Sequence, residues 1–168
     1  MFCDIYREYF EYVSAALLHL GVSEADLMDL TQAVFLVVHV KLPTFEGRAE
    51  IATWLFSICR RTASSYRRKA RFRREAAWSG SEIEHHWALE RNTVSVEALM
   101  ARRGLREQVQ AILNRLPEAQ RVVFVMSELE ELTGPEIAKT IGIPVGTVRS
   151  RLRLARATFE RLGRQNKL

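Results

Sequence analysis

The sequence predicts an all-α protein of two small helical domains joined by a flexible linker, the C-terminal one containing a helix-turn-helix. Apolar residues recur three or four positions apart through most of the chain, which is the period of a buried helix face. Proline and glycine, at 4 and 8 of 168 residues, interrupt few positions. The period is lost over residues 75–94, where a Ser-Gly-Ser break and four glutamates indicate the linker. The predicted domains are therefore residues 1–74 and 95–168.

Three helices are expected in the first domain. The first covers residues 6–20, and a capping box of Ser23 and Asp26 begins the second, which ends before Pro43. A short polar loop, residues 44–50, separates it from the third helix, which continues into a strongly basic segment. The domain is thus expected to present one long basic helix.

The second domain begins with a helix for which Ser95 is a plausible N-cap, and Pro117 starts the next helix. A capping box of Thr133 and Glu136 then begins a short helix. Gly142 supplies the permissive backbone that a tight turn between two helices often needs. This pattern predicts a helix-turn-helix in residues 130–156.

The last helix has two distinct faces. Its apolar residues follow the helical period and form a core stripe: Val148, Leu152, Ala155, Phe159 and Leu162. Arg149, Arg153 and Arg156 are spaced i, i+4 and i+7 on another face. Guanidinium and hydroxyl groups near the start of a helix suit the base edges and phosphates of duplex DNA. The competing interpretation is an ordinary amphipathic helix with a solvated basic face.

Charge is unevenly distributed along the chain. Residues 48–74 contain nine Lys or Arg and one acidic residue, and residues 149–168 contain seven and one. Residues 1–47 are acidic, with seven Asp or Glu against two basic residues. Two separate basic blocks predict two contacts with nucleic acid, and the acidic segment predicts a protein-docking face.

Other function classes find little support in the sequence. Two cysteines are too few for a disulfide scaffold, and no signal peptide or apolar run of membrane-spanning length is evident, so we expect a cytoplasmic protein. The histidines and cysteines lack the spacing of a zinc site, and we expect neither a metal nor a cofactor. No phosphate-binding glycine motif or catalytic constellation is present, so we do not expect an enzyme.

Three stretches of the chain are informative together: DLTQAVFLVVHVKL at residues 29–42, TFEGRAEIATWLFSICRR at residues 44–61, and the long segment at residues 116–156 that contains the helix-turn-helix. In this order they resemble the extracytoplasmic-function (ECF) group of the sigma-70 family of bacterial RNA polymerase sigma factors. The resemblance implies that domain 1–74 docks on core polymerase and melts the −10 element, and that domain 95–168 recognises the −35 element.

The resemblance also implies roles for individual residues. Asp29 and Gln32 match the surface that binds the clamp of the largest polymerase subunit, β′. The residues expected to contact and melt the −10 element are Phe45, Arg48, Arg60, Arg61, Tyr66, Arg67 and Arg68. Trp54, nearby, is expected to be a core residue. Arg149, Ser150 and Arg153 are expected to recognise the −35 element, with Thr147, Arg151 and Arg156 on phosphates.

The leading hypothesis is therefore an initiation factor that binds core RNA polymerase and promoter DNA. The resemblance implies that an anti-sigma factor controls it. The chain itself is not expected to insert into a membrane. The alternative is a stand-alone helix-turn-helix regulator, often dimeric, which binds duplex DNA without polymerase. A nucleic-acid enzyme or single-strand binding protein is a remote third hypothesis.

Overall fold

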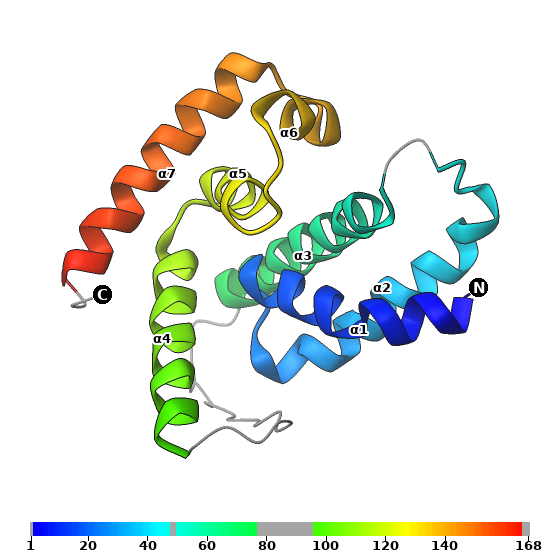
Figure 1. The fold of residues 1–168 in the computed structure, drawn as a ribbon, viewed down its shortest axis with the longest axis horizontal. Helices are drawn as coiled ribbons and strands as arrows, with labels where there is room; N and C mark the ends of the chain where they lie inside the picture. Colours follow the sequence, from blue (N-terminus) through cyan, green and yellow to red (C-terminus); the bar gives the residue numbers. More distant parts are fainter. Residues whose placement is uncertain (1, 48–49, 77–95, 166–168) are drawn as a thin grey trace. The chain divides into compact units, whose positions relative to one another are not determined.

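The computed structural model describes residues 2–47, 50–76 and 96–165, with side chains described for these residues outside 71–103. The chain divides into two compact units, Met1–Trp87 and Ala88–Leu168. The described residues form seven α-helices and one short 3-10 helix, with no β-strand among them (Figure 1). The all-α prediction is confirmed.

The first unit contains three α-helices and the 3-10 helix. These are α1 (Phe2–His19), α2 (Glu24–Lys41), η1 (Leu42–Thr44) and α3 (Ile51–Ala76). Each α-helix packs against the other two. Their apolar faces meet in a core that includes Leu17, Val34 and Phe56, which are fully buried. Because this core uses one face of α3, the opposite face remains available for its arginines.

The start of α2 differs from the predicted capping box. Ser23 is the N-cap residue, but its side chain makes no capping hydrogen bond to the helix. Its hydroxyl instead donates to Oδ2 of Asp26 at 2.8 Å. The prediction of a Ser23–Asp26 capping box was therefore wrong: a second helix, α3, competes for the Asp26 carboxylate through the hydroxyl of Tyr66.

The end of α3 also differs from the expectation. The helix continues to Ala76, two residues beyond the predicted domain boundary at residue 74. The remainder of the predicted linker lies outside the described residues, as does the predicted N-cap Ser95. The domain boundaries thus remain a proposal.

The second unit contains α4 (Val96–Arg115), α5 (Glu118–Glu128), α6 (Gly134–Ile141) and α7 (Val145–Gln165). Helix α7 packs against the other three, with Val148, Ala155 and Leu162 of the predicted stripe buried. The buried side chain of Arg121 braces the corner between α4 and α5, because its Nη2 donates to the carbonyls of Asn114 at 2.8 Å and Leu116 at 3.1 Å.

The helix-turn-helix forms as predicted from α6 and α7. Thr133 and Glu136 form the capping box, in which the Thr133 backbone N–H donates to Oε2 of Glu136 at 2.8 Å. Gly142 ends α6 in the left-handed conformation, with φ 70°, which a residue with a Cβ rarely adopts. The helix-turn-helix therefore depends on local sequence at both ends of α6.

Candidate nucleic-acid interface

The recognition helix α7 presents two arginines to solvent near its start. Arg149 and Arg153 are exposed, while Val148 and Ala155 on another face are buried. Neither arginine makes a hydrogen bond or ion pair with any residue that the structure describes. Both guanidinium groups can therefore reach a ligand without breaking an internal contact.

The other predicted contacts near the start of α7 are mixed in exposure. Ser150 is exposed, and its hydroxyl donates to the Thr147 carbonyl at 3.0 Å, so its oxygen lone pairs remain available. Thr147 and Arg151 are half-buried. Polar side chains thus accompany the two exposed arginines on the first three turns of the helix.

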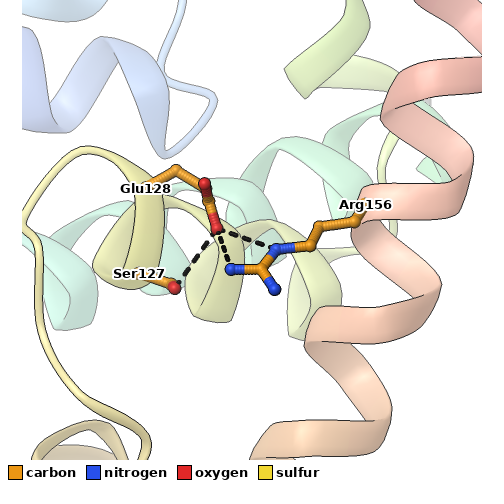
Figure 2. Close-up of polar contacts among 3 residues, drawn as sticks. All are labelled: Ser127, Glu128 and Arg156. Atoms are coloured by element: carbon orange, nitrogen blue, oxygen red, sulfur yellow. Dashed lines mark hydrogen bonds and ion pairs between the residues drawn. The ribbon is translucent and has the colours of Figure 1, made fainter.

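Arg156 differs from the other arginines of this face. Its Nε and Nη2 both donate to Oε1 of Glu128 on α5, at 3.0 Å and 2.6 Å (Figure 2). The hydroxyl of Ser127 donates to the same oxygen at 3.3 Å. Sequence reasoning did not select Glu128, because it lies 28 residues before Arg156 and no motif connects them.

Glu136 completes the capping box at the start of α6. The hydroxyl and backbone N–H of Thr133 both donate to its carboxylate, at 2.6 Å and 2.8 Å. These hydrogen bonds hold the pKa of Glu136 below its ordinary value of 4.5. The carboxylate is therefore ionised, and the capping box complete, at neutral pH.

The basic face of α3 contains the arginines expected to contact the −10 element. Arg61 and Arg68 are exposed, whereas Arg60 and Arg67 are half-buried. Arg48 lies outside the described residues. Two of these four arginines are therefore exposed and two are partly covered. The exposed pair, Arg61 and Arg68, is the better placed to contact DNA.

Two aromatic residues expected at the −10 element already have partners within the fold. Phe45 lies against Trp54, with ring centroids 4.8 Å apart, and both are half-buried. Trp54 therefore packs within the fold as expected, but it is half-buried where a fully buried core residue was expected. The hydroxyl of Tyr66 donates to Oδ2 of Asp26 at 2.8 Å and lies 3.0 Å from the Ser23 hydroxyl.

The exposed face of α2 combines polar and apolar side chains. Asp29 and Gln32 are exposed as the resemblance implied. Leu36 and Val40 continue the same face at i+7 and i+11 from Asp29, and they are 69% and 74% exposed. Sequence reasoning missed these two residues because the apolar character of α2 on several sides obscured which side was buried.

A groove of about 370 Å³ lies between α2 and α3. Asp26, Asp29 and Leu30 line it from α2, and Tyr66 and Lys69 are among its α3 residues. Asp29 of the predicted polymerase-binding surface therefore lies beside residues of the predicted DNA-melting helix. The two predicted surfaces share one groove.

Other sites are not evident in the described parts of the chain. No group of three or more His, Cys, Asp or Glu is placed to hold a metal ion there. Over the same residues, no helix has the length and apolar character needed to cross a bilayer.

Comparison with known proteins identifies the family. The family model "Sigma-70 region 2" matches residues 5–73, and "Sigma-70, region 4" matches residues 106–159. The ECF RNA polymerase sigma-E factor of Escherichia coli (strain K12) is 32% identical over 156 residues, covering 90% of this chain and 81% of that protein. The chain belongs to the ECF sigma factors of the sigma-70 family. This sigma factor is also 30% identical over 156 residues to the ECF RNA polymerase sigma factor RpoE of Cereibacter sphaeroides, covering 92% of this chain and 81% of that one.

Solved structures share the fold of this sigma factor. The sigma factor RpoE in complex with the anti-sigma factor NepR from Bartonella quintana gives a TM-score of 0.70 at 20% identity, covering 95% of this chain and 96% of that one. CnrH in complex with the cytosolic domain of CnrY gives a TM-score of 0.63 at 24% identity, covering 96% and 86%. The resemblance inferred from the three sequence stretches is thus confirmed. The sigma-70 family is not an enzyme family.

Proposed function

We propose that this sigma factor binds core RNA polymerase, directs it to promoters with −35 and −10 elements, and assists DNA opening. The observation that carries the proposal is a pair of exposed arginines on α7, Arg149 and Arg153, which make no hydrogen bond or ion pair with the described residues, in a chain matched by both sigma-70 region models. A helix with free guanidinium groups near its start can enter the major groove and donate to guanine O6 and N7.

Recognition of the −35 element is assigned to the start of α7. Arg149, Ser150 and Arg153 contact base edges, while Thr147 and Arg151 contact phosphates. At about 100° per residue, the first three residues fall on one side of α7 and the other two on an adjacent side, which supports this division because base edges face the groove floor and phosphates line its walls. Arg156 belongs to the same predicted set, but its guanidinium is bonded to Glu128.

Contact with the −10 element is assigned to α3 and the loop before it. Arg61 and Arg68 follow the backbone of the displaced strand, with Arg60, Arg67 and Arg48 contributing further positive charge. The exposure of Arg61 and Arg68 supports this role, since cationic side chains along a groove bind single-stranded DNA through its phosphates. Phe45 contributes by stacking only if its contact with Trp54 opens.

Docking on core polymerase is assigned to the exposed face of α2. Asp29 and Gln32 provide polar contacts at one end, and the high exposure of Leu36 and Val40 supports an apolar contact at the other. A helix with such a face suits docking against another helix. This matches the β′ clamp coiled coil that the family resemblance implies as the partner.

Control by an anti-sigma factor is part of the proposal. Two solved structures that share this fold are complexes: one of the sigma factor RpoE with the anti-sigma factor NepR, and one of CnrH with the cytosolic domain of CnrY. A partner that covers the α2 face would block polymerase docking. We place the protein in the cytoplasm, where its polymerase works, and assign the chemistry of RNA synthesis to that polymerase.

The test is transcription in vitro. Sigma-free core polymerase is mixed with this protein and a library of promoter fragments, and the 5′ ends of the transcripts are sequenced. Discrete starts that share −35 and −10 motifs are expected. Their absence, together with tight binding to duplex DNA without polymerase, would instead support a stand-alone regulator.

A further inference from the structure

The ion pair between Arg156 and Glu128 connects the recognition helix to α5 (Figure 2). Two nitrogens of the guanidinium converge on one carboxylate oxygen, and Ser127 donates to that oxygen as well. Three donors on one oxygen define where the carboxylate lies. The position of the Arg156 side chain is thereby defined relative to α5.

Arg156 is committed to this contact, unlike its neighbours on the same face. Arg149 and Arg153 make no hydrogen bond or ion pair among the residues whose side chains the structure describes. The pair uses two of the five guanidinium N–H groups, so a phosphate bound by the remaining three would lie beside the Glu128 carboxylate. Because a carboxylate repels a phosphate, such a contact is unfavourable.

The ion pair between Arg156 and Glu128 is expected to contribute little to the stability of the fold. The side chains are 54% and 36% exposed, and ion pairs with that exposure contribute little to folding. Glu128 is also the last residue of α5, where a negative charge is unfavourable to the helix dipole. The geometry of the pair therefore matters more than its contribution to the free energy of unfolding.

The pair lies one turn from a ring contact between the same two helices. Phe159 of α7 stacks on Phe124 of α5 with ring centroids 4.9 Å apart. The buried residues of α7 already restrict its rotation about the helix axis, and the ion pair, one turn from the rings, restricts that rotation further. Arg149 lies seven residues from Arg156, about 10 Å along the helix, so a rotation changes where its guanidinium points.

We propose that Glu128 and Arg156 form a positioning pair, through which Arg156 orients the recognition helix for −35 recognition without itself binding a phosphate. This inference rests on the proposed function, since it concerns the same helix. It adds Glu128 as a determinant of promoter recognition, although Glu128 contacts no DNA.

The test measures promoter affinity of the reconstituted holoenzyme at several salt concentrations. The variants are Glu128→Ala, Arg156→Ala, the double variant E128A/R156A and the charge swap E128R/R156E. For a positioning pair, each single variant weakens affinity for a promoter with an intact −35 element by about fivefold, and the double variant is no weaker than either. The charge swap recovers affinity to within about twofold, and the slope of log affinity against log salt is unchanged.

A phosphate contact predicts a different pattern. In that case E128A binds as tightly as wild type, R156A lowers the salt slope by about one, and the charge swap does not recover affinity. Either of the first or last results would overturn the proposal. The matched control is the exposed pair Arg164 and Glu160 on α7, 3.4 Å apart, for which R164A and E160A should leave affinity unchanged.

Failure of the proposed function is distinguishable from failure of this inference. If wild-type protein directs no transcription starts, the function fails in the wild-type sample alone. The same variants are then compared on duplex DNA selected by the protein without polymerase, where the charge swap and the double variant decide between positioning and phosphate contact in the same way.

Discussion

The hydroxyl of Tyr66 on α3 donates a hydrogen bond of 2.8 Å to the carboxylate of Asp26 at the start of α2. This bond joins the proposed DNA-melting helix to the helix proposed to dock on polymerase. The Ser23 hydroxyl donates to the same carboxylate oxygen, so three polar groups meet where α2 begins. Tyr66, which was expected to contact the −10 element, thus also links α3 to α2.

Removal of this hydroxyl should destabilise the first unit. Tyr66→Phe keeps the ring and loses the hydrogen bond, which should lower the free energy of unfolding by about 1 kcal/mol. Chemical denaturation followed by circular dichroism measures the change. Tyr6→Phe is the control, because the Tyr6 hydroxyl makes no hydrogen bond with any described residue. Equal effects of the two variants would show that the bond to Asp26 does not stabilise the unit.

Arg149 and Arg153 should determine −35 specificity. Arg149→Ala and Arg153→Ala should each weaken holoenzyme binding by about 1–3 kcal/mol and relax base preference at one position of the element. Binding to promoters with every base at each −35 position measures both effects. Arg161→Ala removes the same charge from an exposed position on another side of α7. Comparable loss in that variant would indicate a general charge effect instead of base recognition.

The apolar end of the α2 face should be needed for polymerase binding. Leu36→Glu places a charge where an apolar contact is proposed, and affinity for core polymerase should fall by about tenfold or more. Fluorescence binding to sigma-free core polymerase gives the affinity. Leu105→Glu makes the same substitution at an exposed residue of α4, 52% exposed, and should have no such effect. Unchanged binding of the Leu36 variant would remove this face from the docking surface.

The capping box of α6 should contribute stability only above acidic pH. Hydrogen bonds from Thr133 lower the pKa of Glu136 in the folded protein, so the contribution is present above its ordinary value of 4.5 and is lost as pH falls through the lowered pKa. The difference in Tm between wild type and Glu136→Gln should therefore shrink below about pH 4.5. Glu11→Gln, an exposed charge on α1, is the control. A difference that stays constant with pH would contradict a role for the ionised carboxylate.

Local patterns in the sequence determined most of the fold. Thr133, Glu136 and Gly142 predicted the helix-turn-helix because caps and turns are decided by residues a few positions apart. The stripe that includes Val148, Ala155 and Leu162 predicted which side of α7 is buried, since one helix period sets one face. The family followed from motifs of the same local kind.

Local patterns could not predict where side chains from two helices compete for the same hydrogen-bond partner. Asp26 was expected to cap its own helix, but the Tyr66 hydroxyl, 40 residues later, bonds the carboxylate that the motif required. The exposure of Leu36 and Val40 likewise depends on which side of an apolar helix meets α1 and α3.

By itself, the sequence determined a helical protein with a basic last helix, because periodicity, caps and charge are properties of short segments, and the resemblance of three stretches to sigma factors indicated the family. Only the tertiary structure decided which arginines of that helix bond to another described helix. Arg149, Arg153 and Arg156 are chemically identical and share one face, yet Arg156 alone of these three bonds Glu128 of α5. That distinction arises because packing brings two helices together, and no spacing along the chain encodes it.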